Sequence, residues 1–355
     1  MNRRNFVKQL LAIGFMSSSV NAVANNFTST TLISERKYPV EDPFIFDSED
    51  AVIKVVGIGG GGCNALNLLI DKGVYGAKFI AIDSDPQTLK LSKAAVHMHI
   101  NETTTQTSSD ADYAHIAKQI KDANMLIIVS GMGGETGKAL TTLVSKISRE
   151  LNILTIAIVT SAPACDESRA LCAAEGIESL RKNVDSIIVV PIDELIRAHN
   201  SVMPGVLRIA NTELWNAVAC ITEMINAPGL IGVDFADVRT VISEKGTAMV
   251  GSGVATGPDR ALKATQLALA SPLLKSMDIK HARGILVSTT STNMLKLREI
   301  DQVMASIRLA GKEATIVQGA VFDKSMGDEM RVAIIATGID SPIQARPSVP
   351  TVKPV

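Results

Sequence analysis

Short apolar runs alternate with segments whose apolar residues recur at helical spacing, from about residue 51 to residue 339. In the first half this pattern predicts strands over 53–56, 78–82, 125–130, 154–160 and 186–190, with helices between them, among them 65–72 and 112–123. Near-continuous apolar strands that alternate with helices are typical of a parallel sheet covered on both faces. The pattern therefore predicts an α/β fold with a parallel-sheet domain over residues 51–203.

A long helix is predicted to follow over 204–226, because Pro204 suits a first helical turn and Pro228-Gly229 comes directly after its end. Its apolar residues spread around more than one face, which indicates a helix buried between two bodies. We therefore expect a central helix over 204–227 and a second, smaller α/β domain over 228–339. Strands of that domain are predicted over 284–289, 314–318 and 331–337.

The two ends of the chain differ from this pattern. Arg3-Arg4, a short apolar run over 10–16 and the small residues Ala22-Val23-Ala24 predict a twin-arginine export signal over 1–24. A disordered extension with a chance Arg-Arg pair is the alternative. Polar residues 25–50 indicate a linker, and residues 340–355, with four prolines, indicate a disordered tail.

Composition narrows the classes of function. The net charge is -1, no basic cluster is present and aromatic residues make up 3%, which argues against a nucleic-acid-binding protein. The four cysteines lack the spacing of metal ligands, so they are expected to be buried free thiols and no metal site is predicted from protein ligands.

Two glycine-rich turns carry the candidate chemistry. The turns span 57–64 and 131–137, and each follows a predicted strand and precedes a helical pattern. Glycines let the backbone approach a ligand, and amide groups at a helix start point at an anion. Two such turns in one sheet suggest a single nucleotide held from two sides. The first turn alone also fits a dinucleotide fingerprint with Asp83 as ribose-binding acid, so a Rossmann NAD-dependent oxidoreductase is a remote alternative.

From about Ala51 to Ile339 the chain resembles the FtsZ family, the bacterial relatives of tubulin. The first turn with Asn64, Ala65 and Asn67 is similar to the family's first nucleotide loop, and the second turn is similar to the tubulin signature loop. The longest collinear match runs over 228–241 and continues through 251–255 and 271–274. The resemblance implies a tubulin/FtsZ-like fold with a parallel-sheet nucleotide-binding domain, a long central helix and a second α/β domain.

The resemblance also implies the ligand and its contacts. GTP or GDP, with Mg²⁺, would be held by Gly59, Gly60, Gly61, Gly62, Cys63 and Asn64 of the first turn, by Gly133, Gly134, Glu135, Thr136 and Gly137 of the second, and by Glu167, Arg169 and Thr212 farther along. Subunits of the family stack head to tail, and Asp234 and Asp237 match the acids that enter the neighbour's GTP site and polarise water. The alternative is that these aspartates only cap the next helix.

Departures from the family pattern cluster on the nucleotide. Glu135 stands where the family has glycine, and a carboxylate beside phosphates is repulsive by on the order of 1 kcal/mol. Lys138 is expected to compensate in part, or to pair with Glu135 instead. The family binds the ribose through a glutamate. Cys165 stands at the position that the family's spacing gives to this glutamate, and Glu167 is the nearest residue that could take its role. Thr212 replaces an aspartate that reads guanine, so guanine preference should weaken.

Three further departures concern the protein's assembly and catalysis. The Thr/Ser-rich loop over 101–109 replaces a glycine-alanine loop that meets the γ-phosphate, and Gly232 stands where the family has asparagine. The tail lacks the family's C-terminal peptide that docks to membrane anchors.

Two functional hypotheses follow. The first is an FtsZ-like GTPase that self-assembles head to tail and hydrolyses GTP at the subunit interface at a reduced rate, with a role in cell division or a related filament. The second is a non-hydrolysing structural relative. The expected partner is the chain itself, or another FtsZ copy. The working location is the cytoplasm, and export by the twin-arginine signal is the alternative.

Overall fold

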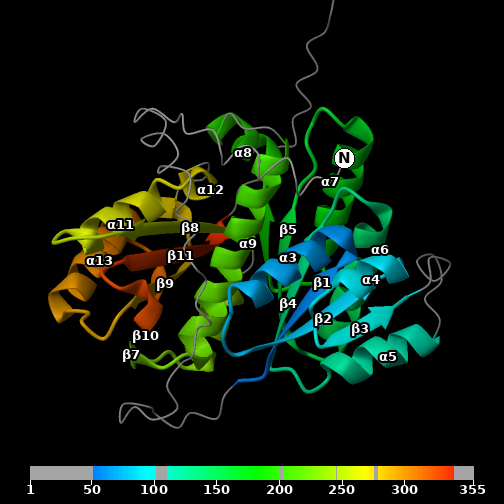
Figure 1. Ribbon diagram of the computed structural model, residues 1–355, viewed down its shortest axis with the longest axis horizontal. Coiled ribbons are helices and arrows are strands. Elements are labelled where there is room, and N and C mark those ends of the chain that lie inside the picture. Colours follow the sequence, from blue (N-terminus) through cyan, green and yellow to red (C-terminus); the bar gives the residue numbers. More distant parts are fainter. Residues whose placement is uncertain (1–50, 101–109, 200–202, 245, 276–278, 340–355) are drawn as a thin grey trace, which may run out of the picture. The chain divides into compact units, whose positions relative to one another are not determined.

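The computed structural model describes residues 51–100, 110–199, 203–244, 246–275 and 279–339 (Figure 1). Its helices are α3 Gly59–Asp71, α4 Pro86–Leu91, α5 Asp110–Ile120, α6 Glu135–Glu150, α7 Glu167–Arg181, α8 Ile192–His199, α9 Met203–Asn226, α10 Phe235–Ile242, α11 Arg260–Leu269, α12 Pro272–Lys275 and α13 Leu297–Ala310, with the 3-10 turns η2 Ile279–His281 and η3 Lys324–Met326. Its strands are β1 Ile53–Ile58, β2 Ala77–Asp83, β3 Val96–His99, β4 Met125–Gly131, β5 Leu154–Thr160, β6 Ser186–Val190, β7 Gly229–Ile231, β8 Thr247–Ala255, β9 Gly284–Ser291, β10 Thr315–Phe322 and β11 Met330–Ile339.

The first six strands form the predicted parallel sheet, in the order β3-β2-β1-β4-β5-β6. Successive residues of a strand face opposite sides, and Val55 and Val56 of β1 accordingly enter two different cores. One core packs against α3, α8 and α9, and the other against α5, α6 and α7. The sheet is therefore covered on both faces, which confirms the interpretation of its near-continuous apolar strands.

The remaining strands extend the same sheet instead of forming a separate one. β8 joins β6 through only two residue pairs, Ile187 with Thr247 and Ile188 with Ala248. Beyond β8 the order is β11-β9-β10-β7, with β9 and β10 parallel and the other pairs antiparallel. The sequence missed β3, β7 and β8, although every strand that it predicted is present.

Close packing explains the glycines of β8. A Cβ built at Gly253 would lie 2.2 Å from the carbonyl oxygen of Ala264, and one at Gly251 would lie 2.4 Å from that of Ala268. Both carbonyls belong to α11, so the helix lies directly on the strand at these two positions. A third core of buried apolar residues then fills the space between α11, α13 and the antiparallel strands.

Helix α9 lies between the parallel strands and the β8–β11 strands (Figure 1). Residues 214–224 are buried all around the helix, as its apolar pattern predicted. At its C-terminal end, Asn226 Nδ2 donates to the carbonyl oxygens of Ala51, 3.0 Å away, and Gly76, 2.8 Å away. These residues precede β1 and β2, so the end of α9 is fixed where those strands begin.

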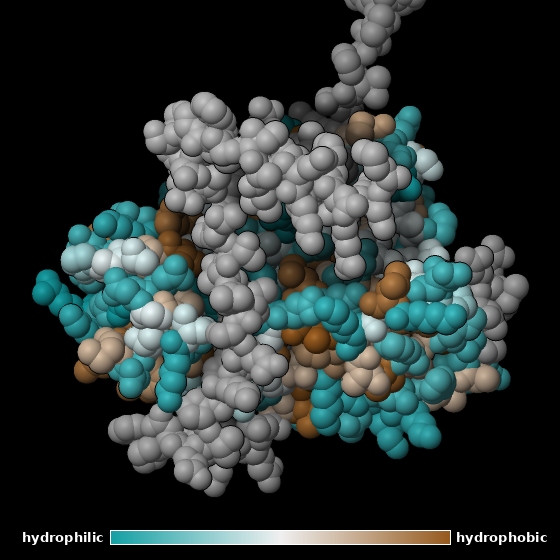
Figure 2. Space-filling view, in the orientation of Figure 1, coloured by the Kyte–Doolittle hydropathy of each residue, from teal (hydrophilic) through white to brown (hydrophobic). Residues whose placement is uncertain are grey.

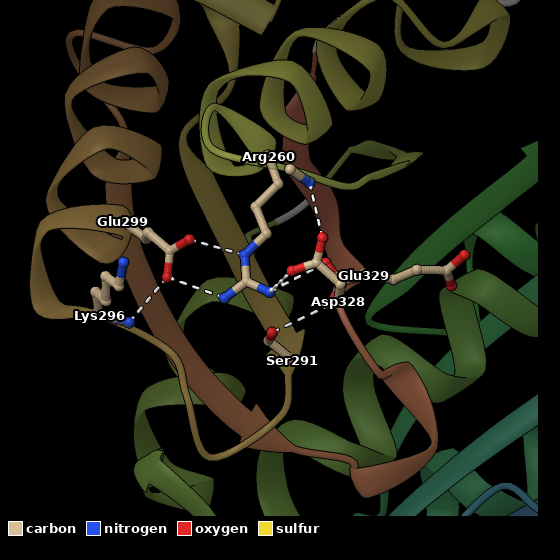
Figure 3. Close-up of polar contacts among 7 residues, drawn as sticks. Arg260, Ser291, Lys296, Glu299, Asp328 and Glu329 are labelled. Carbon is tan, nitrogen blue, oxygen red and sulfur yellow. Dashed lines mark hydrogen bonds and ion pairs between the residues drawn. The ribbon is translucent and has the colours of Figure 1, made fainter.

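A buried ion pair joins α11 to α13 (Figure 3). Arg260 donates from Nε and Nη2 to the two carboxylate oxygens of Glu299, at 2.7 and 3.1 Å, and its side chain is only 7% exposed. The amide of Lys296 donates to the same carboxylate at 2.9 Å, and Arg260 Nη1 donates to the Asp328 carbonyl at 3.1 Å. Every oxygen of the Glu299 carboxylate therefore has a donor, which is the condition for burying such a pair.

Hydrophilic side chains cover most of the coloured face seen in Figure 2, and apolar residues lie there in separate small groups. Within the described ranges, no helix has the length and apolar character needed to cross a bilayer. The predicted export signal over 1–24, the linker over 25–50, the loop over 101–109 and the tail over 340–355 lie outside the described residues.

Candidate functional site

The two glycine-rich turns meet at the carboxyl edge of neighbouring parallel strands, because β1 and β4 pair directly. A Cβ built at Gly61 would lie 3.5 Å from Gly131 Cα, and one built at Gly59 would lie 3.6 Å from Gly137 Cα. The backbones of the two turns are thus in van der Waals contact. The structure brings together the two segments that the sequence suggested would hold one nucleotide.

Two of these glycines are required by the packing of the turns themselves. A Cβ at Gly62 would lie 2.3 Å from the carbonyl oxygen of Val129, and one at Gly137 would lie 2.4 Å from that of Gly131. In contrast, a Cβ at Gly60 or Gly134 would meet nothing within 4 Å. The open side of each turn therefore faces space that a ligand can enter.

Helix starts supply the donors. The helix after the first turn was predicted to begin at residue 65, but α3 begins at Gly59, so the glycines form its first turn. The residues that precede the two helices are Ile58 before α3 and Gly134 before α6. Neither has a side chain that accepts a hydrogen bond from the first amides of its helix. Uncapped amide N–H groups at two adjacent helix starts form an anion-binding arrangement.

The side chains beside these glycines have distinct environments. Burial raises the pKa of the Cys63 thiol to about 12, and nearby Asp83 adds to the shift, so the thiol stays protonated at neutral pH. Asn64 is exposed beside it. Thr136 Oγ1 lies 3.4 Å from Ser84 Oγ, which links the second turn to the end of β2. Sequence reasoning missed Ser84, although its position directly after a parallel strand was a usable signal.

In the free protein Lys138 pairs with Glu175 and not with Glu135, although the Glu135 charge also contributes to its raised pKa, and its compensation of Glu135 beside a nucleotide stays a prediction. Its Nζ lies 2.6 Å from Glu175 Oε2, and this hydrogen bond raises the pKa of Lys138. Glu135 instead accepts a hydrogen bond from the Cys172 thiol at 3.5 Å. Burial, followed by this contact, raises the pKa of Cys172. The exposed Glu135 carboxylate therefore stands at the start of α6 without a pairing lysine.

The candidate ribose residues lie at the start of α7. Asp166 caps this helix by accepting from the Arg169 amide at 3.2 Å, and its carboxylate lies 3.3 Å from Arg169 Nε. A Cβ at Gly133 would lie 3.5 Å from Arg169 Cβ, so this arginine adjoins the second turn. Glu167 is exposed nearby. Cys165 is exposed too, so the prediction that all four cysteines are buried was wrong for this one. It precedes α7 in a turn instead of lying inside an element.

Thr212 lies on α9, where its Oγ1 donates to the carbonyl oxygen of Arg208 at 3.0 Å. This local bond uses the only proton of the hydroxyl. Thr212 can therefore accept a hydrogen bond from a base with its single oxygen, but it cannot accept two parallel hydrogen bonds as a carboxylate can. This is the physical reason for which we expect Thr212 to recognise guanine more weakly than an aspartate would, and that expectation stays a prediction.

The two aspartates lie at the opposite end of the chain's sheet from the glycine turns. Val233 packs against Gly319 together with Met224 in the last turns of α9, and that end of α9 is fixed where β1 begins. The glycine turn follows the other end of β1, whose six residues span roughly 20 Å. The structure therefore does not bring Asp234 and Asp237 to the glycine turns of their own chain.

Both aspartates are exposed, but they differ in their contacts. Asp234 Oδ1 accepts from the Ala236 amide at 3.1 Å and caps α10, the contact that the capping interpretation predicted, while the catalytic role of this residue stays a prediction. The Asp237 carboxylate accepts no hydrogen bond from the described residues. In the described ranges no three His, Cys, Asp or Glu side chains are grouped as metal ligands would be.

Comparison with known proteins matches both halves of the chain. Residues 52–200 match the GTPase domain of the tubulin/FtsZ family, and residues 246–340 match the C-terminal domain of the FtsZ family. The cell division protein FtsZ of Buchnera aphidicola subsp. Baizongia pistaciae is 39% identical over 82% of this chain and 80% of its own.

Solved structures of FtsZ proteins are also similar to this chain. A point mutant of FtsZ from M. jannaschii is 34% identical with a TM-score of 0.77, covering 82% of this chain and 92% of its own. An empty FtsZ dimer from the same organism is 31% identical with a TM-score of 0.76, covering 92% and 93%. The Rossmann oxidoreductase hypothesis was therefore wrong, since it accounts for neither match. With both domains matched and a relative at this level of identity along most of its length, the chain belongs to the FtsZ family and carries its GTPase domain.

Proposed function

We propose that this protein binds GTP between its two glycine turns, assembles head to tail, and hydrolyses GTP where one subunit meets the next. One observation carries the proposal: the two glycine turns and the two exposed aspartates lie at opposite ends of the sheet of one chain. A chain built this way completes its site only by stacking, because stacking places one subunit's aspartates against its neighbour's turns.

The residues that hold the nucleotide divide by chemistry. The amides of residues 59–64 and 133–137 would hold the phosphates, Arg169 and Glu167 would adjoin the ribose, and Thr212 would contact the base. Mg²⁺, when bound, would neutralise phosphate charge. The described residues offer no cage of three acidic or histidine ligands, so phosphate oxygens and water would supply most of its coordination.

Asp237 is the residue we assign to the water. Its carboxylate is exposed and free of hydrogen bonds within the described part of the chain. It can therefore accept a hydrogen bond from a water molecule in the neighbouring subunit's site. Asp234 supports it by capping α10, which fixes the first turn of the helix that carries Asp237. Glu135 opposes phosphate binding and supports a reduced rate of turnover.

Sedimentation of residues 25–355 with GTP, with GDP and without nucleotide tests assembly. We expect pelleting that requires GTP, together with phosphate release. Pelleting that ignores the nucleotide would support the non-hydrolysing structural relative instead.

Mixing two inactive variants tests the shared site. Asp237→Ala should abolish turnover while nucleotide affinity stays roughly intact, and Gly62→Ala should abolish nucleotide binding. In a copolymer of equal parts, up to roughly a quarter of the junctions combine intact turns with an intact aspartate, so partial turnover should return. A mixture as inactive as its components, in copolymers confirmed by labelling, would place catalysis within one chain.

We further propose domain boundaries at 51–203, 204–227 and 228–339, a cytoplasmic location, and a role in cell division or a related filament. The named function of the relatives supports this role. Fractionation of a C-terminally tagged protein, with the mass of its N-terminus, would test the location. Removal of residues 1–24 would support export instead.

A further inference from the structure

A cleft of about 690 Å³ lies at the amino ends of β5 and β6, the edge of the sheet opposite to the glycine turns. The last turns of α6, α7 and α10 surround it. Its lining contains four cationic side chains and one acidic side chain, whereas the whole chain has 35 lysines and arginines against 36 aspartates and glutamates. The cationic residues are Arg149, Arg181, Lys182 and Arg239, and the acid is Asp185.

Two of the cations have structural roles. Arg149 Nη1 donates to the Lys182 carbonyl at 2.6 Å, and Arg181 Nη1 donates to Thr247 Oγ1 at 2.8 Å. Both arginines lie in last helical turns, where positive charge stabilises the carbonyl end of a helix. The Asp185 carboxylate accepts a hydrogen bond from the Thr155 amide at 2.7 Å.

Lys182 and Arg239 have no such role. Both side chains are exposed, and neither makes a hydrogen bond or ion pair with another described side chain. They come from different parts of the fold, Lys182 from the end of α7 and Arg239 from α10, and they line the same cleft. Two cations without partners among the described residues leave the positive charge of this cleft uncompensated.

A buried hydroxyl adds an independent observation. Ser186 lines the cleft at the first position of β6, is only 2% exposed, and its Oγ has no hydrogen-bond partner among the described residues. A buried polar atom left without a partner is unfavourable, and a ligand that enters the cleft can supply one to Ser186.

We propose that this cleft binds a small phosphate-bearing molecule, with Lys182 and Arg239 on the phosphate and Ser186 donating a hydrogen bond. The guanidinium of Arg239 matches phosphate oxygens in fork geometry. The volume of the cleft exceeds a lone phosphate and falls in the range of small-molecule sites. The ligand would link α7 to α10, and α10 carries Asp237 in its first turn, so occupancy would act on the orientation of that aspartate.

Calorimetric titration of the GDP-saturated full chain with inorganic pyrophosphate tests the site. The cleft variant is K182Q/R239Q, and the matched control is K118Q/K263Q, which removes two exposed lysines from α5 and α11. We expect the parent and the control to bind pyrophosphate alike, and the cleft variant to bind it about tenfold or more weakly with unchanged GDP affinity. Ser186→Ala should also weaken binding without lowering the unfolding temperature.

Three results would overturn the proposal. These are no pyrophosphate binding by the GDP-saturated parent, equal binding by the cleft variant and the control, and binding of a hexaglutamate peptide in place of pyrophosphate. The last result would identify a docking site for acidic protein segments. Since the side chains of Lys182 and Arg239 make no polar contacts with the described residues, loss of folding does not confound the cleft variant.

Discussion

Replacing glycines one at a time by alanine separates the packing of the two turns from their binding of a ligand. The relevant pair is Gly62 and Gly60, which lie two residues apart in the first turn of α3. The methyl group of Gly62→Ala would begin 2.3 Å from Val129 O and 3.1 Å from Gly57 C, all backbone atoms of neighbouring segments. Gly60→Ala would place the same methyl group where nothing lies within 4 Å.

The expected magnitudes follow from these distances. Ordinary contact begins at 3.4 Å, so α3 must move from β4 by about 1 Å to accept alanine at Gly62, at a cost of about 1–3 kcal/mol. Alanine at Gly60 introduces no clash, and it reduces the freedom of the unfolded chain, which stabilises by about 0.4–1 kcal/mol. If phosphate occupies the open space, Gly60→Ala should still weaken GTP binding by about tenfold or more.

The assay has two readouts for each variant. Thermal unfolding without nucleotide measures packing, and titration with a fluorescent GTP analogue measures the ligand site. Gly62→Ala should lower both stability and affinity, whereas Gly60→Ala should lower affinity alone. The reasoning is refuted if Gly60→Ala binds the analogue as the parent does, because phosphate then does not approach this turn. A parent-like stability of Gly62→Ala would refute the packing argument.

Three further predictions concern single side chains. Thr212→Asp restores a two-fold acceptor for the base, so the preference for GTP over ATP in competition binding should rise about tenfold or more. Glu135→Gly removes a carboxylate beside the phosphates, so the GTP dissociation constant should fall severalfold, by on the order of 1 kcal/mol. Glu299→Ala leaves the buried Arg260 without its partner and should lower the free energy of unfolding in urea by about 3–5 kcal/mol. Burial alone would raise the pKa of Glu299, but hydrogen bonds from Arg260 and the Lys296 amide hold it below its ordinary value. Its stabilisation is therefore present above the unfolded pKa of about 4.3 and is lost as pH falls, and Glu299→Gln should flatten this acid slope.

The sequence predicts the parallel strands well because both of their faces are buried. The bounds predicted for β5 and β6 are those observed, since every position of these runs is apolar or small. The missed β8 shows the limit of this signal. Its glycines look like a loop along the chain, but the segment pairs with β11, and a Cβ built at Gly253 or Gly251 would lie 2.2 or 2.4 Å from a carbonyl oxygen of α11. Such a contact between two elements leaves no pattern within the strand itself.

The same distinction holds for the candidate site. The glycine turns were recognisable from their spacing, because a turn that binds phosphate is built from consecutive residues. The bond of Lys138 to Glu175 joins two helices and could not be predicted from either one. The separation of Asp237 from the turns depends on which end of β1 receives the end of α9, and this contact joins segments far apart in the chain.

That asparagine also ties the first two strands to a segment of the chain that is synthesised much later. Its amide serves carbonyls 175 and 150 residues earlier, at the starts of β1 and β2. Those carbonyls lack this partner until residue 226 has left the ribosome, and long-range closure of this kind is slow. A fragment that stops before α9 therefore lacks the group that holds the starts of its first two strands together, and we expect it to be less stable than the same strands in the full chain.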